Sequence, residues 1–257
     1  KIYKKSRLPN SSNEDVKRWL QEKWINGKVY NPTNGSATYG VIGAGVMGAG
    51  IAQLIISKLQ EGATRVYLKD IKDEFVQKGM KFIEDLLRKR KKEKLMAFVK
   101  GGTDESELAK CDIIIEAAIE KMDVKKKILQ SIESEWIKQL SVAQPTADPD
   151  TLLKNSNKIF CTNTSTLSVT ELASASKNPA NVVGLHFFNP VHRMPLIEIV
   201  RGQHTSDETV VHCYNLSLQL GKTPIVVNDG PGFLVNRILG AYLLEAQRLL
   251  NEGYNIQ

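Results

Sequence analysis

The chain has 257 residues, of which 42% are hydrophobic and 25% charged, and its formal net charge is +7 at pH 7. This composition is ordinary for a globular protein and includes no apolar run near the roughly 18 residues that a membrane-spanning helix requires. The positive charge suits an anionic ligand, but no element that reads nucleic acid accompanies it, so we expect no nucleic-acid partner. The cysteines Cys111, Cys161 and Cys213 show neither close pairing nor metal-type spacing, which favours reduced thiols in an intracellular protein and no metal site.

The first 37 residues read as a linker. An amphipathic patch over residues 15–24 is followed by a turn-rich run over residues 31–36. The chain begins with Lys and shows no signal peptide. We therefore expect residues 1–37 to connect the rest of the chain to something upstream.

Residues 39–50, with the sequence YGVIGAGVMGAG, join a short apolar run to the pattern G-x-G-x-x-G and the start of a helical pattern. Gly43 allows a tight turn, Gly45 lets a pyrophosphate approach the backbone, and Gly48 lets the helix pack close to the strand. The phosphates then lie at the helix N-terminus, where free N–H groups and the helix dipole favour negative charge. This order of strand, glycine turn and helix predicts a dinucleotide site.

A second apolar run, residues 65–69, ends in Asp70, near the position of an acid that binds the ribose of a dinucleotide. With the glycines, Asp70 makes dinucleotide binding the preferred interpretation, although the same residue alone could simply cap the next helix. An acid here repels the 2′-phosphate of NADP and so favours NAD. Lys69 and Lys72 beside it weaken that preference.

The rest of the chain alternates helical and strand patterns. We expect helices over 75–87, 121–136 and 236–250, and strands over 112–118, 158–163, 182–190, 196–200 and 223–227. Residues 141–157, with two prolines, read as a loop or poorly structured insertion, and the basic block 88–94 reads as a solvated helix face or an anion site. The alternation predicts an α/β fold, a Rossmann-type doubly wound and mostly parallel sheet over 38–228, followed at 229–257 by the start of a truncated all-helical domain.

Several polar residues fall at or just after the expected strand ends, where ligands bind in such sheets: Asn163, Ser165, His186 and Asn189. A histidine is close to the ideal general base near neutral pH. On its own, however, His186 between two apolar neighbours would more often be a hydrogen-bonded core residue. His192, His204 and His212 have no such context and read as surface or packing residues.

Five motifs in order resemble the 3-hydroxyacyl-CoA dehydrogenase family of fatty acid β-oxidation: GVIGAGVMGAGIA, EAAIEKMDVKKKI, TNTSTLSVTELA, GLHFFNPVHRMPLIEIV and DGPGFLVNRI. The resemblance spans about residues 39–253 and is greatest to the dehydrogenase part of a multifunctional β-oxidation enzyme. It implies an enzyme that oxidises an L-3-hydroxyacyl-CoA to the 3-oxoacyl-CoA with NAD, and a homodimer through a C-terminal helical domain missing here. Bacterial cytoplasm, mitochondrion and peroxisome all fit.

Carried over to the matching positions, the resemblance makes His186 the catalytic base and Glu198 its carboxylate partner. It makes Ser165 and Asn236 the residues that hold the substrate and order the site. The implied cofactor-binding residues are Gly43, Gly45, Val46, Met47, Gly48, Asp70, Glu120, Lys125, Asn163 and Asn189. Ser165 could instead belong to a turn that caps a helix starting near residues 168–170, and Asn236 could be a helix N-cap.

Two departures from the family concern the mouth for acyl-CoA. Residues 82–104 form a shorter segment than the family's helical hairpin, and residues 141–157 form a longer one than is usual. The shortened segment and the C-terminal helices missing here each leave one alternative open. One is an NAD-dependent dehydrogenase of a free hydroxy acid, and the other is a non-catalytic NAD-binding module.

Overall fold

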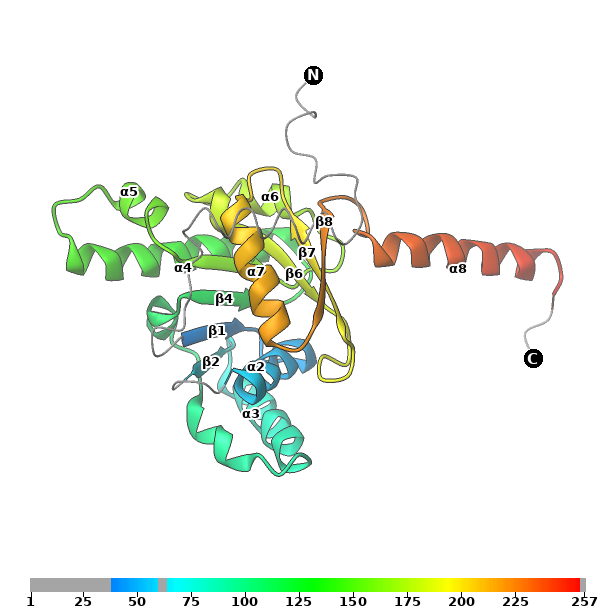
Figure 1. Ribbon diagram of the computed structural model, residues 1–257, viewed down its shortest axis with the longest axis horizontal. Coiled ribbons are helices and arrows are strands. Elements are labelled where there is room, and N and C mark those ends of the chain that lie inside the picture. The colour runs from blue at the N-terminus through cyan, green and yellow to red at the C-terminus, as the bar shows by residue number, and fades with distance from the viewer. Residues whose placement is uncertain (1–37, 60–63, 255–257) are drawn as a thin grey trace, which may run out of the picture.

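The computed structural model describes residues 38–59 and 64–254, and the linker expected at 1–37 lies outside this range. Its centre is an eight-stranded sheet with the order β3-β2-β1-β4-β5-β6-β7-β8 (Figure 1). All neighbouring strands are parallel except β6 and β7, which are antiparallel. The strands are β1 (Thr38–Ile42), β2 (Arg65–Lys69), β3 (Val99–Gly102), β4 (Ile113–Glu116), β5 (Ile159–Thr162), β6 (Val182–Phe187), β7 (Leu196–Arg201) and β8 (Thr223–Asn228).

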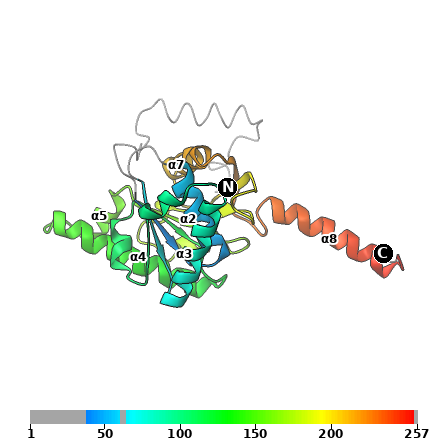
Figure 2. The same cartoon turned by 90° about the horizontal axis from the view of Figure 1, so that it is seen from below.

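Helices cover both faces of this sheet, as the two views in Figures 1 and 2 show. The helices are α2 (Val46–Lys58), α3 (Asp73–Arg88), α4 (Met122–Ala143), α5 (Pro149–Lys154), α6 (Val169–Ala173), α7 (Asp207–Gln219) and α8 (Val235–Asn251), with 3₁₀ turns η2 (Glu93–Phe98), η3 (Ser106–Lys110) and η4 (Pro179–Asn181). One hydrophobic core joins the sheet to α2, α3 and α7, and a second joins it to α4, α5 and α6. Strands buried on both faces explain the continuous apolar runs in the sequence, and the doubly wound α/β fold is confirmed.

The expectation of a loop over residues 141–157 is wrong in part. Helix α4 continues to Ala143, beyond the predicted end at residue 136, and α5 begins at Pro149. Proline suits the first turn of a helix because that turn has no partner for its N–H. The carboxylate of Asp148 caps α5 by accepting from the N–H of Thr151 at 2.8 Å, and Leu153 is buried in the second core. The two prolines therefore fit the observed structure, with Pro145 in the turn between α4 and α5 and Pro149 in the first turn of α5.

Strand β3 and helix α7 were not among the predicted elements. The sequence of β3 is only Val-Lys-Gly-Gly, too short and too rich in glycine to give a strand signal. Its partner β2 holds it in a parallel register that pairs Val66 with Val99. Helix α7 starts at a Ser206 cap and buries seven of its residues, so its apolar face is clear only once the sheet is present.

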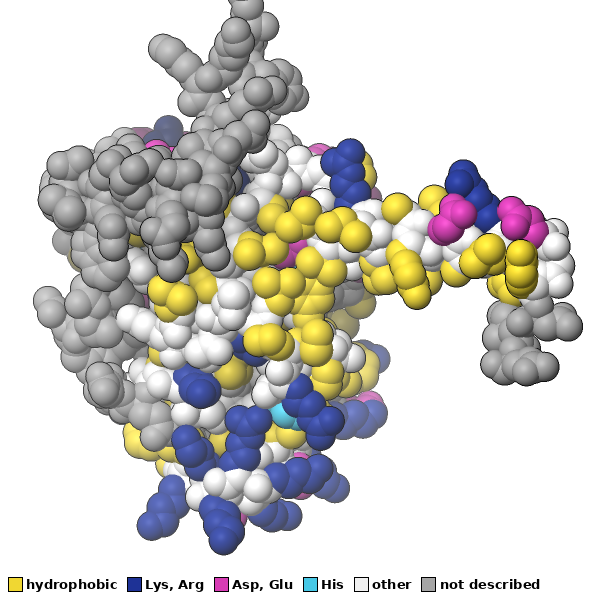
Figure 3. Space-filling view, turned by 45° about the vertical axis from the view of Figure 1, so that its right-hand side comes forward, with side chains coloured by type: hydrophobic (Ala, Val, Ile, Leu, Met, Phe, Trp, Pro, Cys, Tyr) yellow, Lys and Arg dark blue, Asp and Glu magenta, His cyan; other side chains and the backbone are white. Residues whose placement is uncertain are grey.

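Helix α8 projects away from the sheet (Figures 1 and 2), which confirms the predicted helix at 236–250. None of its residues is buried. Its large apolar side chains remain exposed: Ile238, Leu239, Tyr242, Leu243, Leu244, Leu249 and Leu250. In Figure 3 hydrophobic side chains run along this helix and continue onto the neighbouring body. The assignment of 229–257 to a second domain stays a prediction.

The basic block 88–94 lies where α3 ends and η2 begins. Figure 3 shows Lys and Arg side chains gathered around a histidine in the lower part of the view. Arg90 donates to the carbonyl of His192 at 3.3 Å, and Lys92 donates to the carbonyl of Ser57 at 3.3 Å. Partial burial, together with Arg90 and other nearby cations, lowers the pKa of His192. The block thus lies beside the turn between β6 and β7, and its role as an anion site stays a prediction.

Buried His212 on α7 predicts an acid-sensitive fold. Burial lowers the pKa of His212 from 6.5 to about 4. The unfolded chain takes up this proton first, so the stabilisation is present above about pH 6.5 and is lost as the pH falls toward the folded pKa. We expect the free energy of unfolding to drop by about 2 kcal/mol between about pH 7.5 and about pH 5 through this group. Urea denaturation of a His212→Asn variant should show a flatter pH dependence, whereas exposed His204→Asn should match the parent chain; equal slopes for parent and His212→Asn would contradict the assignment.

Candidate functional site

The glycine turn between β1 and α2 has the geometry that its sequence predicts. Gly43 has φ +98°, a conformation that disfavours other residues, and its N–H donates to the carbonyl of Lys69 at 2.8 Å. A Cβ on Gly48 would lie 1.8 Å from the carbonyl oxygen of Gly43, so only glycine fits there. Helix α2 begins at Val46 without a side-chain cap, which leaves N–H groups of its first turn available to an anion.

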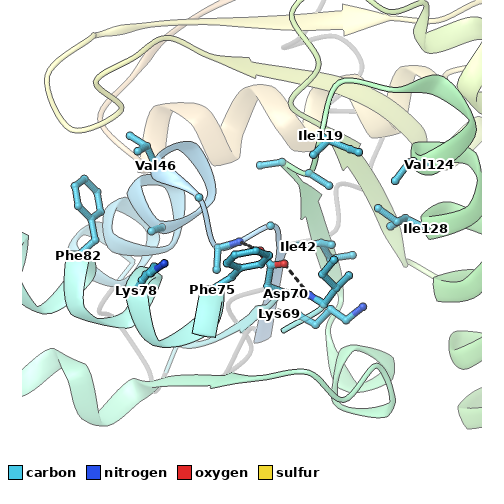
Figure 4. Close-up of a pocket in the computed structure, with 18 of the residues that line it drawn as sticks. Ile42, Val46, Lys69, Asp70, Phe75, Lys78, Phe82, Ile119, Val124 and Ile128 are labelled. Carbon is cyan, nitrogen blue, oxygen red and sulfur yellow. Dashed lines mark hydrogen bonds between the residues drawn. The ribbon is translucent and has the colours of Figure 1, made fainter. Parts of the chain in front are cut away.

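A cavity of about 690 Å³ opens beside this turn (Figure 4). Gly43, Gly45, Val46 and Asp70 line it, together with apolar side chains from α3, α4 and the segment after β4. A Cβ placed on Gly45 would meet no heavy atom within 4 Å, so the space before the helix N-terminus is open to a ligand. An open glycine backbone, an uncapped helix and a largely apolar cavity fit a dinucleotide with an adenine base.

Asp70 follows β2 and joins the two loops that frame the cavity. Its carboxylate accepts from the N–H of Ala44 at 2.6 Å and from the N–H of Ile71 at 2.7 Å. Neighbouring Lys69 is buried and forms an ion pair with Glu105 at 2.5 Å, which offsets its positive charge. The Nζ of Lys72 lies 5.8 Å from the centre of the Phe75 ring. The charge of Lys69 is therefore committed to Glu105, and the acid of Asp70 keeps its effect against a 2′-phosphate.

The structure brings His186 and Glu198 together on the neighbouring strands β6 and β7, one strand in from the β8 edge of the sheet. They are direct partners in the antiparallel register of β6 and β7, and His186 Nδ1 lies 2.7 Å from Glu198 Oε2. Both side chains are buried, and the rings of Phe188 and Phe233 lie 4.5 and 5.9 Å from the imidazole. When Nδ1–H donates to the carboxylate, Nε2 carries the lone pair and can take a proton.

Glu198 is also held by the start of α8. Its Oε1 accepts from the N–H groups of Leu234 and Val235 at 3.0 and 2.9 Å. Burial raises the pKa of Glu198, but the hydrogen bonds from His186, Val235 and Leu234 outweigh it, so the pKa lies below its ordinary value. The carboxylate therefore remains ionised near neutral pH and can stabilise an imidazolium.

A second network joins four more of the predicted residues. Glu120 accepts from the N–H of Ser165 at 2.8 Å and lies 3.3 Å from Lys125, while Asn236 donates to the carbonyl of Ser165 at 3.2 Å. Burial raises the pKa of Glu120, but hydrogen bonds from Thr164 and Ser165 and the charge of Lys125 lower it overall. These polar contacts thus link α4, the loop after β5 and the first turn of α8. The cap of α6 is Ser168, not Ser165, and Asn236 lies inside the first turn of α8.

The remaining predicted residues lie at the same edge of the sheet. Asn163 follows β5, and its side-chain oxygen accepts from the N–H of Phe187 on β6 at 2.8 Å. Asn189 is exposed in the turn after β6. Met47 lies in the first turn of α2 and packs partly against the first core. Gly50 of α2 approaches Val191 after β6, since a Cβ there would lie 3.2 Å from it. The glycine turn and the loop that follows His186 therefore adjoin.

Two further acids were not among the predicted site residues. Glu116, at the end of β4, is fully buried and binds Lys125 Nζ with both oxygens, at 2.7 and 2.9 Å. A charged residue at the end of an apolar strand was its only signal. Glu105 lines the cavity after β3, a strand that the sequence did not reveal. Within residues 38–59 and 64–254, no group of His, Cys, Asp or Glu side chains gathers in a way that could hold a metal ion.

The sheet, the glycine turn, the acid after β2 and the cavity define an NAD-binding domain of the dehydrogenase class. The chain matches the family model for 3-hydroxyacyl-CoA dehydrogenase, NAD binding domain, over residues 38–230. It belongs to this family, and its cofactor is NAD.

Similar curated proteins and solved structures are consistent with this family. The fatty acid oxidation complex subunit alpha of Acinetobacter baylyi is 39% identical over 203 residues, which are 76% of this chain and 26% of that protein. The chain thus spans about a quarter of the length of the curated relatives it matches. The (S)-3-hydroxybutyryl-CoA dehydrogenase of Ralstonia eutropha superimposes with a TM-score of 0.71 at 39% identity, covering 84% of this chain and 72% of that one. The dehydrogenase part of multifunctional enzyme 1 from C. elegans gives 0.59 at 26% identity, covering 90% and 51%.

Because the space before Gly45 is open, a substitution at this residue should weaken NADH binding without affecting folding. In a Gly45→Ala variant the methyl group projects where a pyrophosphate would approach the backbone, so the dissociation constant of NADH should rise by about tenfold or more. The melting temperature should stay unchanged, because the added Cβ meets no protein atom. Fluorescence titration with NADH and a thermal melt measure the two effects.

Gly240→Ala on exposed α8 is the matched control, because an added Cβ there also meets open space. It should leave NADH affinity unchanged. Gly48→Ala should unfold the turn instead, since its Cβ would overlap the carbonyl of Gly43. Parental NADH affinity in Gly45→Ala would contradict this location of the phosphates.

Proposed function

We propose that this protein is an NAD-dependent L-3-hydroxyacyl-CoA dehydrogenase, which oxidises the 3-hydroxyl of an acyl-CoA to a ketone. The buried pair of His186 and Glu198, 2.7 Å apart beside the nucleotide turn, carries this proposal. Membership of the 3-hydroxyacyl-CoA dehydrogenase family supports the choice of substrate class. The relatives named fatty acid oxidation complex subunit alpha support a role in fatty acid β-oxidation within a multifunctional enzyme.

In this mechanism His186 acts as the general base. Its Nε2 takes the proton of the substrate hydroxyl, while Glu198 stabilises the imidazolium through Nδ1. NAD, when bound, supplies the acceptor for the hydride that leaves the same carbon. Phe188 and Phe233 flank the imidazole and limit its contact with water, which strengthens its interaction with Glu198.

We assign the remaining predicted residues to positioning. Ser165 and Asn236 hold the substrate, and their shared hydrogen bond connects the loop after β5 to α8. We assign Glu120, Lys125, Asn163 and Asn189 to the nicotinamide half of the cofactor, where buried Lys125 acts through its ion pair with Glu120. The nucleotide half of the cofactor is bound by Gly43, Gly45, Val46, Met47, Gly48 and Asp70. A hydroxyl or carboxamide donor at a developing alkoxide lowers the barrier because the charge is met by an oriented dipole.

The assembly and compartment are part of the proposal. The exposed apolar side chains of α8 favour contact with further helices, and we propose a homodimer formed through that region. Among the described residues, no helix combines the length and hydropathy needed to cross a membrane. The three free cysteines are buried, in keeping with an intracellular location, cytoplasmic in a bacterium and mitochondrial or peroxisomal in a eukaryote.

Replacing the base tests the mechanism. In the full-length protein, His186→Ala should lower kcat for a 3-hydroxyacyl-CoA by at least about 100-fold, because general-base catalysis contributes about 10²–10⁴ in rate. The dissociation constant for NADH should remain close to that of the parent enzyme. Following NADH absorbance for turnover and NADH fluorescence for binding separates the two effects. Exposed His204→Ala should behave as the parent does, and near-normal turnover by His186→Ala would refute the role of the base.

Substrate class has its own test. A series of 3-oxoacyl-CoA thioesters of increasing chain length, each compared with its free acid, is assayed by NADH consumption. We expect kcat/KM for the thioester to exceed that for the free acid by about 100-fold or more, since remote binding energy raises the rate at the reacting carbon. Equal rates would favour the dehydrogenase of a free hydroxy acid. NADH binding without turnover of either would favour the non-catalytic module.

A further inference from the structure

The cavity ends in an ion pair that the proposed chemistry does not use. Lys69 on β2 and Glu105 after β3 both line the cavity, with Lys69 Nζ 2.5 Å from Glu105 Oε1. The hydroxyl of Ser131 on α4 donates to the other carboxylate oxygen of Glu105. The Lys69 side chain is 9% exposed and that of Glu105 36%, so the lysine is nearly enclosed while the acid still faces the cavity.

The surroundings of this pair suit a flat aromatic ring. Val124, Ile128 and Ser131 follow one another at intervals of four and three residues, so they lie on one face of α4. Val124 and Ile128 line the cavity, and Ser131, one turn further on, fixes Glu105. Figure 4 shows Lys69, Val124 and Ile128 on the side of the cavity away from Phe82 of α3. A ring stacked on this apolar stripe directs its edge toward Lys69 and Glu105.

The pair presents a fixed order of donor and acceptor. The ammonium of Lys69 only donates and the ionised carboxylate of Glu105 only accepts. Burial acts to raise the pKa of Glu105, but hydrogen bonds from Lys69 and Ser131 lower it overall, so the group stays an acceptor near neutral pH. Adenine offers an amino donor beside a ring-nitrogen acceptor. A 6-oxopurine offers an acceptor where adenine has its amino donor.

We propose that Lys69 and Glu105, fixed by Ser131, select adenine at the base end of the NAD site. Glu105 accepts from the 6-amino group, and Lys69 donates to a ring nitrogen. This inference rests on the NAD site of the family and does not depend on the acyl-CoA activity. It adds a specificity element to the cavity that Asp70 and the glycine turn also line.

The test compares NADH with reduced nicotinamide hypoxanthine dinucleotide, which differs at the purine edge alone. Fluorescence titration of the protein should give an affinity for NADH about tenfold or more higher, because a charged group left without its hydrogen bond is costly. In Glu105→Gln the amide can donate as well as accept, so the preference should fall below about threefold. Ser131→Ala, which frees Glu105 to turn, should reduce the preference as well.

Glu107→Gln is the matched control, because Glu107 pairs with Lys100 and Lys110 and does not line the cavity. It should keep the parental ratio of the two affinities. A merely structural role for Glu105 would weaken both dinucleotides equally and leave that ratio unchanged, which would overturn the proposal. Equal affinities in the parent protein would also overturn it, and binding of neither dinucleotide would count in addition against the NAD site. If Glu105→Gln fails to fold, Ser131→Ala decides.

Discussion

The site depends on the reversal of strand direction between β6 and β7. In the otherwise parallel sheet, this antiparallel pair sets His186 directly opposite Glu198. Side chains opposite each other across two strands lie close enough to interact without any loop to position them. The backbone register therefore places the imidazole and the carboxylate side by side without help from the surrounding loops.

Each buried charge near the site is held by several partners. Glu198 accepts from an imidazole and two N–H groups, and Glu116 from Lys125, Thr162 and Ala118. Taking a charge out of water costs several kcal/mol unless hydrogen bonds replace its hydration. Multiple partners meet this cost and leave each side chain a single orientation. For Glu198, the hydrogen bonds from His186, Val235 and Leu234 keep its pKa below the ordinary value despite burial.

Features that depend on a few neighbouring residues could be predicted from the sequence. The geometry of the glycine turn could be predicted directly, because each requirement, a positive φ or a close approach, acts within a few residues; the role of Asp70 stays a prediction. Contacts between distant segments could not be read in this way. The opposition of His186 and Glu198 came from resemblance to a family, because no periodicity in the sequence reveals that β7 reverses. The pairing of Lys69 with Glu105 escaped notice, because it depends on β3, which gives hardly any strand signal.

The attachment of Glu198 to α8 has a mechanical consequence. The 17 residues of α8 leave the body immediately after Leu234, and the same carboxylate that holds the imidazole holds the backbone at this point. Glu198 thus connects the first turn of α8 to the imidazole of His186. A binding partner on the exposed apolar side of α8 that moved this end of the helix would therefore also shift the carboxylate and the histidine bound to it.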